Sequence, residues 1–283
     1  MADYLGAHMS ISGGLYKAID RAVAAGCGTL QIFTRSSNQW KGKPVSDKDA
    51  ELFRSSFAAS GLHEVISHDI YLINLAAPEG DTRTKSLAAF ADEMITCAQL
   101  GINKIVMHPG SHTADPPEIG LERVISAFNQ LFEEVPQYEG LILLETTAGQ
   151  GTNLGRTFEE LQIIINGSKN PERFGICFDT CHTFAAGYNT ATPEGYADVM
   201  EQFDRLLGLK RLHCFHMNDS KKGLGSRVDR HEHIGQGTLG LEPFRFIMND
   251  QRFASVPKIL ETPKGDDDEM DQVNMQLLRG LAG

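Results

Sequence analysis

The sequence is poor in cysteine, and its few cysteines do not form a pattern typical of disulfide frameworks or cysteine-rich metal sites. There are five, an odd number, and no two of them occur as C-x-x-C. Scattered single cysteines are typical of proteins from a reducing compartment. We therefore expect free, mostly buried thiols and a cytoplasmic location.

Long apolar runs are also missing. The runs reach about five residues, as around LILL at 141–144, whereas a transmembrane helix needs about 20. The first ten residues, MADYLGAHMS, do not combine a basic segment with an apolar run, so they do not resemble a signal peptide. We expect no membrane partner.

Positive charge is in deficit, with a formal net charge of -11 at pH 7. Proteins that bind nucleic acid usually carry excess Lys and Arg, because these side chains neutralise phosphates. The deficit argues against nucleic acid unless some of the carboxylates hold divalent cations, which would add positive charge inside the site.

The most informative feature present is a repeated pattern of short apolar runs. Their ends lie about 36 residues apart on average, near the size of one strand–helix unit. Continuous apolar runs are typical of parallel strands that are covered on both faces. The eight runs end at His8, Phe33, His68, His108, Glu145, Asp179, His216 and Glu261.

A helical pattern follows every run. Ser46 and Thr192 are typical N-caps and Gly101 is a typical helix stop. The eight units predict a single-domain α/β protein, a (β/α)₈ TIM barrel spanning residues 1–283. An open doubly wound sheet is less favoured, because no G-x-G-x-x-G follows the first run. The helical patterns cover 13–26, 46–61, 82–101, 116–135, 157–167, 192–208, 242–250 and 266–280.

Seven of the eight runs end in His, Asp or Glu, and six of these ends follow one another in the chain from His68 to Glu261. The active site of such a barrel lies at the carboxyl ends of its strands, so these side chains would meet at one mouth. A single strand that ends in a polar residue is ordinary. Six strands whose last residues are all His, Asp or Glu are not. Such donors suit Zn²⁺ or Mn²⁺, and they exceed what one zinc ion needs. We predict two or three ions, an arrangement typical of phosphate ester hydrolysis.

A loop of about 20 residues follows Asp219 and shows neither helical nor strand periodicity; long loops of this kind are usually functional or disordered. Asp229, His231 and His233 are spaced at i, i+2 and i+4. This spacing does not distinguish which histidine binds a metal ion. A solvated charged loop is the alternative interpretation.

Six segments of the chain resemble endonuclease IV, a family of zinc-dependent apurinic/apyrimidinic endonucleases of base-excision repair. The segments are HPGSH (108–112), ETTAGQG (145–151), FDTCHTFAAGYN (178–189), HMNDSK (216–221), GSRVDRHEHIG (225–235) and ILETP (259–263). The likeness extends over nearly the whole chain. It implies a TIM barrel that holds three zinc ions, with Mn²⁺ able to replace part of the zinc.

The resemblance also implies three sets of metal ligands, in which Glu145 bridges two ions and His182 belongs to the loop after the sixth strand. It favours His231 over His233. Glu145 and Glu261 are the expected catalytic residues. The first zinc would be held by His68, His108 and Glu145, the second by Glu145, Asp179, His216 and Glu261, and the third by His182, Asp229 and His231.

The implied reaction is hydrolysis of the phosphodiester 5′ to an abasic site, leaving a 3′-hydroxyl and a 5′-deoxyribose phosphate. Removal of blocking groups from 3′ ends is implied as a second activity. The ions would activate water and stabilise the leaving oxygen. The expected partner is duplex DNA containing abasic sites, bound by a monomer.

DNA contact is expected from the loops RSSNQWKGK (35–43) and DIYLINLAAP (69–78), whose apolar side chains would enter the duplex, and from the long basic loop. Asn38 stands where some family members carry Arg, and Thr146 where many carry Asn. The first departure would weaken one contact or leave it to Arg35; the second would alter hydrogen bonding beside Glu145. The candidate DNA-binding residues are Arg35, Asn38, Trp40, Tyr71, Leu72, Arg227 and Arg230.

Two other functions remain open at this point. A metal-dependent sugar isomerase would share the barrel, but it needs fewer histidines on its metals and usually a lysine near the site. A non-catalytic, metal-dependent DNA-binding protein would need its metal-bound water to be blocked, and the sequence shows no lost ligand.

Overall fold

Eight parallel strands form a closed barrel in the computed structural model, which describes residues 4–265 and 269–283. The strand order around the barrel is β1-β10-β7-β6-β5-β4-β3-β2. This confirms the predicted TIM barrel. The strands are β1 (Leu5–His8), β2 (Thr29–Phe33), β3 (Glu64–His68), β4 (Lys104–Met107), β5 (Leu141–Glu145), β6 (Phe174–Asp179), β7 (Leu212–His216) and β10 (Lys258–Leu260).

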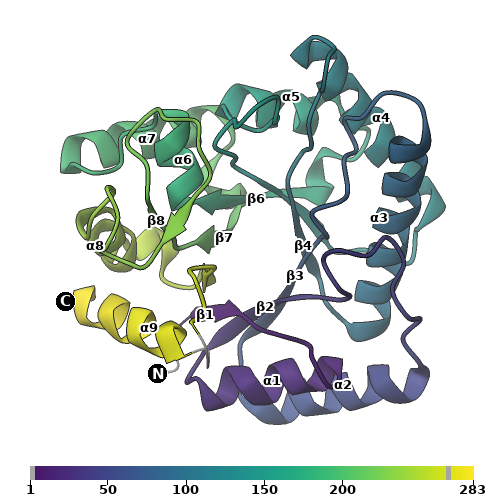
Figure 1. Ribbon diagram of the computed structural model, residues 1–283, viewed down its shortest axis with the longest axis horizontal. Coiled ribbons are helices and arrows are strands. Elements are labelled where there is room, and N and C mark those ends of the chain that lie inside the picture. The colour runs from purple at the N-terminus through teal and green to yellow at the C-terminus, as the bar shows by residue number, and fades with distance from the viewer. Residues whose placement is uncertain (1–3, 266–268) are drawn as a thin grey trace.

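Helices surround these strands, and α9 lies beside the first strand near the start of the chain (Figure 1). They are α1 (Leu15–Ala24), α2 (Asp47–Ser60), α3 (Asp81–Leu100), α4 (Pro117–Glu134), α5 (Phe158–Gly167), α6 (Thr180–Ala186), α7 (Pro193–Leu206), α8 (Glu242–Asn249) and α9 (Glu269–Leu281). Short 3₁₀ turns occur at Pro171–Arg173, Leu209–Arg211 and Gln251–Phe253.

The expected helix ends are confirmed by their local hydrogen bonds. The Ser46 hydroxyl accepts from the Asp49 amide and the Thr192 hydroxyl from the Gly195 amide. Gly101 ends α3 with φ 74°, a left-handed conformation that glycine adopts without a Cβ clash. The last expected helix begins at residues 266–268, which lie outside the described part of the chain.

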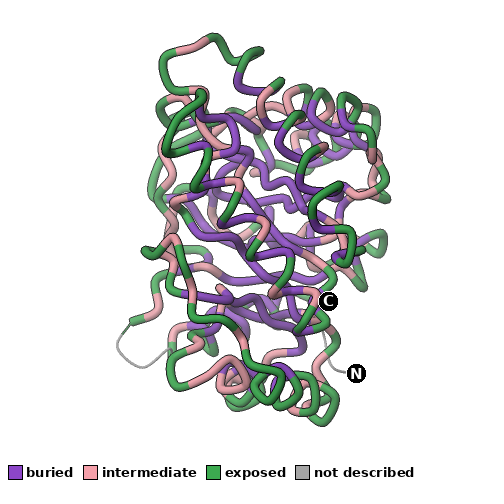
Figure 2. Tube along the Cα trace, turned by 90° about the vertical axis from the view of Figure 1, so that its right-hand side faces the viewer, coloured by how far each residue is buried: buried purple, intermediate pink, exposed green. Residues whose placement is uncertain are grey.

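The barrel interior is a small apolar cluster beneath the mouth. Its six fully buried side chains come from six different strands, and Cys177 and Cys214 are direct neighbours on β6 and β7. Cys177 therefore helps to fill the barrel, in agreement with the expectation of free, mostly buried thiols. The larger core lies between the strands and the helices, and the buried residues follow the centre of the molecule (Figure 2). The interior cluster is Ile66, Val106, Leu143, Cys177, Cys214 and Ile259.

The polar ends of the apolar runs lie at the carboxyl ends of the strands, as predicted. His68, Glu145, Asp179 and His216 are last residues of their strands, and His108 and Glu261 follow β4 and β10 directly. In a parallel barrel these positions share one rim, so the side chains can converge. Among the described residues, no helix is long and apolar enough to cross a membrane.

Candidate metal centre

Nine side chains converge at the mouth and form the three ligand-type groups that contain no cysteine; two overlapping groups include Cys177 with Cys214, or Cys181. Within each group one ligand-type atom per residue lies within 4.8 Å of the others. The groups match the three sets that the resemblance implies. They are His68, His108 and Glu145; Glu145, Asp179, His216 and Glu261; and His182, Asp229 and His231.

Glu145 belongs to two groups because its oxygens face different ways. Oε2 lies 3.1 Å from His68 Nε2 and 3.2 Å from His108 Nε2. Oε1 lies 3.0 Å from His216 Nδ1. The carboxylate is fully buried, so its negative charge must be stabilised by these imidazole partners.

The second group is completed by Glu261, which follows β10. Its Oε2 lies 3.1 Å from His216 Nδ1, and Asp179 Oδ2 lies 3.9 Å from the same nitrogen. One ring nitrogen and three carboxylates thus point at one position.

The third group joins α6 to the long loop. His182 Nε2 lies 3.2 Å from Asp229 Oδ2 and 3.3 Å from His231 Nε2. His231 starts β9 (His231–Glu232), which pairs with β8 (Asp219–Ser220) outside the barrel. His233 instead lies 3.1 Å from the Asn274 side chain, through its Nδ1. The geometry therefore places His231, and not His233, in the group.

The segment that carries His182 differs from the prediction. We expected a loop after the sixth strand, but Thr180–Ala186 form the helix α6. Asp179 is its N-cap, and its Oδ1 accepts from the His182 amide at 2.7 Å. A capping aspartate directly after a strand allows a helix to begin without a connecting loop, which the apolar-run pattern did not reveal.

Three of the five imidazoles in these groups are oriented by hydrogen bonds on their outer nitrogens. His68 Nδ1 donates to Asp69 O at 2.7 Å, His182 Nδ1 to Thr146 O at 2.9 Å, and His231 Nδ1 to Glu261 O at 3.2 Å. A carbonyl can only accept, so each ring carries its proton there and turns a lone pair to the group. This is the usual environment of metal-bound histidine, and the thiol-free donor set suits zinc.

The carboxylates and imidazoles of the groups shift one another's pKa values. Burial raises the pKa of Glu145, but the His216 and His108 imidazoles outweigh it and hold that pKa well below its usual range. Burial lowers the pKa of His216, yet Glu261 and Glu145 raise it well above normal. Against its burial, His182 lowers the pKa of Asp229 to about 2. Such a cluster of charged donors is suited to exchange its protons for divalent cations.

Two positioning side chains were not predicted from the sequence. Gln31 Nε2 donates to Glu261 Oε1 at 2.7 Å and to His8 Nδ1 at 3.0 Å, and its Oε1 accepts from His216 Nε2 at 2.8 Å. Asn218 donates to Asp179 Oδ2 at 2.7 Å and accepts from the Glu261 amide at 2.9 Å. The sequence did contain one indication of the role of Gln31. It is a polar residue within the apolar run TLQIF, and a buried amide needs hydrogen-bond partners.

The Thr146 hydroxyl makes two close contacts beside Glu145. Thr146 Oγ1 accepts from the Asp179 amide at 2.9 Å and lies 3.1 Å from Thr183 Oγ1. The residue therefore ties the end of β5 to the start of α6, on which His182 lies.

Tyr71 lies next to the first group, and Leu72 follows it in the chain. The Tyr71 side chain is 63% exposed, and its ring packs edge-on to Phe33 and against His68. Leu72 is half-buried against the core. A cavity of about 330 Å³ opens beside them and reaches His108 and Asp229.

Arg35 differs from the prediction of a DNA contact. Its side chain is buried, with Nη2 lying 3.0 Å from Glu93 Oε2. The charge is thus neutralised inside the fold, because a buried guanidinium requires a partner. Asn38 is exposed and Trp40 half-buried on the same loop.

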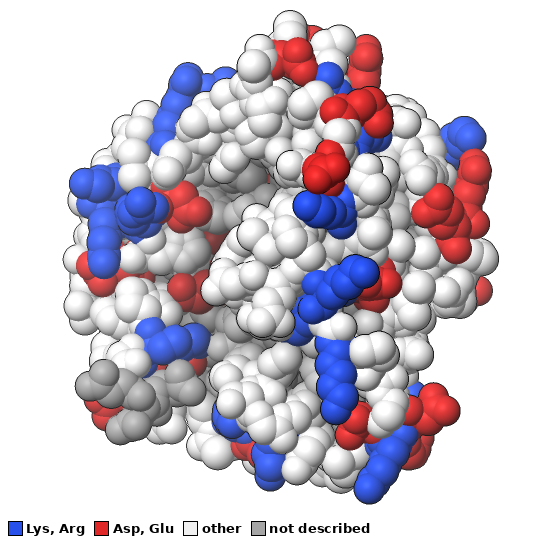
Figure 3. Space-filling view, turned by 45° about the vertical axis from the view of Figure 1, so that its right-hand side comes forward, with Lys and Arg blue, Asp and Glu red and all other residues white. Residues whose placement is uncertain are grey.

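Arg227 and Arg230 are exposed on the long loop. Arg227 has φ 55°, and its amide donates to Ala185 O at 2.9 Å at the end of α6. Arg230 Nη1 donates to the neighbouring Asp229 carbonyl at 2.6 Å. On the face shown in Figure 3, Lys and Arg side chains are interspersed with Asp and Glu.

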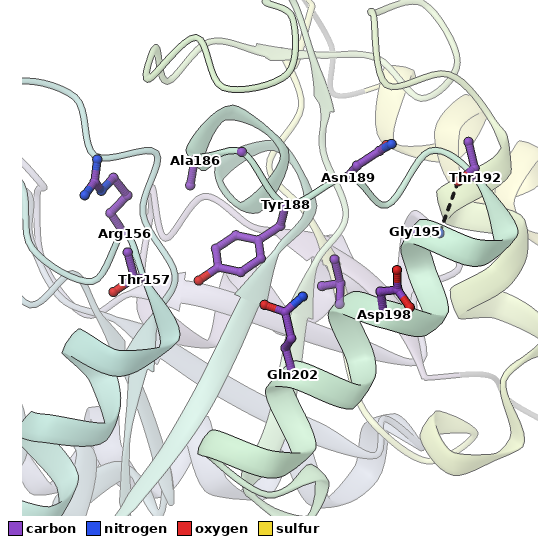
Figure 4. Close-up of a pocket in the computed structure, with 11 residues that line it drawn as sticks. Arg156, Thr157, Ala186, Tyr188, Asn189, Thr192, Gly195, Asp198 and Gln202 are labelled. Atoms are coloured by element: carbon purple, nitrogen blue, oxygen red, sulfur yellow. Dashed lines mark hydrogen bonds between the residues drawn. The ribbon is translucent and has the colours of Figure 1, made fainter.

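A separate groove of about 660 Å³ lies beyond the carboxyl end of α6. Figure 4 shows Tyr188 between Arg156 and Gln202, with Asn189 at one edge. None of the nine converging residues lines it. The groove is therefore distinct from the metal centre.

Comparison with known proteins defines first the class and then the family. Residues 19–280 match the model of the xylose isomerase-like TIM barrels. A D-tagatose 3-epimerase-like protein (20% identity, TM-score 0.70, 98% of this chain and 96% of that one) shares the fold alone. The crystal structure of endonuclease IV from Thermus thermophilus aligns with TM-score 0.87 and 37% identity over 98% of both chains. The "Probable endonuclease 4" of Trichlorobacter lovleyi is 88% identical over 281 residues, 99% of this chain and 100% of that protein. The chain belongs to the endonuclease IV family.

Proposed function

We propose that this protein is an apurinic/apyrimidinic endonuclease of DNA repair, which hydrolyses the phosphodiester 5′ to an abasic site in duplex DNA. The observation that carries the proposal is the shared carboxylate Glu145, with one oxygen facing two imidazoles and the other facing His216. Family membership supports the same activity, since the named relatives are endonucleases.

The three groups would hold three zinc ions, with Mn²⁺ able to replace part of the zinc. When bound, such ions lower the pKa of water, polarise the phosphoryl oxygens and stabilise the leaving oxygen. Glu145 and Glu261 are the proposed catalytic carboxylates, because they face the reacting position between the first two groups. Cleaning of blocked 3′ ends would use the same centre.

The protein's own side chains orient the site. Gln31 and Asn218 fix Glu261 and Asp179 through the hydrogen bonds described above. Preorganised donors of this kind need no rearrangement during the reaction. Tyr71 and Leu72, together with Asn38 and Trp40, would contact the lesion duplex, and Arg227 and Arg230 would contact phosphates.

The test is incision of a duplex that bears one tetrahydrofuran abasic analogue. We expect a single nick 5′ to the lesion, lost after chelation and restored by zinc. Metal analysis should give three ions per monomer. An intermediate that borohydride traps, or incision that survives complete chelation, would refute the proposal. An undamaged duplex of the same sequence is the control.

A further inference from the structure

The loop between β2 and α2 is fixed by a buried ion pair with a helix of the next strand–helix unit. Residues 34–45 contain turns and bends but neither helix nor strand. The Arg35 side chain is 6% exposed and that of Glu93, on α3, is 1% exposed. Arg35 Nη2 and Glu93 Oε2 are 3.0 Å apart.

Glu93 uses both of its carboxylate oxygens. Oε2 also accepts from Thr34 Oγ1 at 2.6 Å, and Oε1 accepts from Ser67 Oγ at 2.5 Å and Cys97 Sγ at 3.6 Å. Ser67 precedes His68 in β3. Because a buried carboxylate is costly without partners, these donors keep Glu93 in one orientation. The network therefore connects the loop to the strand that ends in a candidate metal ligand.

Arg35 in turn contacts both the loop and α3. Nη1 donates to Trp40 O at 3.4 Å, and Nη2 donates to Ala89 O at 3.2 Å. Gly42 packs on the stem of Arg35, since a Cβ placed there would lie 3.0 Å from Arg35 Cβ. The guanidinium thus contacts the loop on its buried side, whereas the Asn38 side chain of the same loop is exposed to solvent.

We propose that the Arg35–Glu93 pair positions the segment 36–43 for DNA binding, so that Asn38 and Trp40 are presented to the duplex. Arg35 and Glu93 act through these residues and do not touch DNA. The inference rests on the proposed function for the identity of the ligand. It assigns a role to the positive charge at Arg35 that differs from phosphate binding.

The opposing interpretation is that the pair only stabilises the fold. In that case its loss would lower the free energy of unfolding but leave the loop unchanged in the folded protein. Trp40 separates the two cases, because it is the single tryptophan of the chain. Its fluorescence reports the loop directly, with or without DNA.

The test is Glu93→Gln in the zinc-loaded protein, which keeps the side-chain shape but weakens the pairing with Arg35. We expect faster acrylamide quenching of Trp40 in the free protein. For the tetrahydrofuran duplex we expect KM to rise about tenfold, because the displaced loop would lose contact with DNA worth about one hydrogen bond. Turnover at saturating DNA should stay within about twofold, since Glu93 bonds to none of the candidate metal ligands.

The matched control is Arg211→Lys at the opposite end of the barrel. Arg211 Nη1 also bonds two carbonyls, Pro171 O at 2.8 Å and Phe174 O at 3.0 Å. This variant should lose stability without a change in Trp40 quenching or KM. If Glu93→Gln does not fold, Arg35→Lys is measured instead, because lysine keeps the charge but cannot bond Trp40 O and Ala89 O together.

Unchanged Trp40 quenching and unchanged KM in a folded variant would overturn the inference. So would an equal change in the Arg211→Lys control. A wild-type protein that does not incise the lesion would instead refute the proposed function, and the fluorescence of the free variants would still decide whether the pair positions the loop.

Discussion

Asp179 and His182 are three residues apart, yet they face two different metal groups and are bonded to each other. Asp179 Oδ1 caps α6 by accepting from the His182 amide, while Oδ2 points to His216 and accepts from Asn218. The same carboxylate is therefore both a helix cap and a candidate ligand.

These two roles can be separated by substitution. In Asp179→Asn the cap should survive, because asparagine is an equally good N-cap, and the stability change should stay below about 1 kcal/mol. Incision should nevertheless fall at least about a hundredfold, because the second group loses a charged donor. Asp179→Ala should show the same loss of activity and a further cost of about 1 kcal/mol. Thermal unfolding and incision rates measure the two effects; full activity in Asp179→Asn would exclude Asp179 as a ligand.

Glu261→Gln tests the catalytic carboxylate that follows β10. The amide keeps the size of the side chain and can still meet Gln31, but it removes the charge that faces His216. We expect incision to fall at least about a hundredfold while binding of the lesion duplex largely survives. Rapid-quench incision and a fluorescence anisotropy titration give the two values. Turnover near that of the wild type would show that Glu261 holds no metal ion.

Zinc affinity should depend steeply on pH. The carboxylates around His68, His108, His182 and His216 outweigh burial and raise the pKa of each ring. A raised pKa means that protons stay bound to a higher pH, and zinc must displace them. Affinity should therefore rise with pH from the ordinary histidine range through the raised values. Competition with a chromophoric chelator measures it, and calorimetry in two buffers should detect proton release on binding. An affinity that is constant with pH would contradict this account.

Gln31→Met should weaken metal retention without unfolding the barrel. Methionine fills the same space, but it leaves His216 Nε2 and Glu261 Oε1 without their amide partner. Loss of such an outer contact usually costs about 10- to 100-fold in metal affinity. Gln130→Met, at an exposed position of α4, is the control. Equal zinc affinity in both variants would show that Gln31 does not support metal binding.

Tyr71→Ala should reduce affinity for the lesion duplex with little effect on stability, since the side chain is largely exposed. Loss of one aromatic contact with a base is expected to cost about tenfold in affinity. Tyr71→Phe should retain binding because the ring remains. Anisotropy titrations with lesion and intact duplexes make the comparison; equal affinity of wild type and Tyr71→Ala for the lesion would exclude a wedge role.

The sequence predicted the barrel because each strand is a continuous apolar run. It predicted six of the nine candidate ligands because the residue type changes abruptly at the strand ends, whereas His182, Asp229 and His231 were implied by the family resemblance. It did not predict α6, whose seven residues are too few for helical periodicity. It did not predict the burial of Arg35, because the partner Glu93 lies 58 residues away, a relation that no local pattern contains. Gln31 was missed for the same reason: its contacts lie on strands distant in the chain.

The contacts of Gln31 cross the place where the two ends of the chain meet. β1 pairs with β10, and Gln31 on β2 reaches over β1 to Glu261 beyond β10. The second metal group is thus complete only when the last strand has docked against the first. Metal binding would then stabilise the pairing between β1 and β10. Chelation should destabilise β10 and α9 before the rest of the barrel, and a protease should therefore cleave the C-terminal segment first.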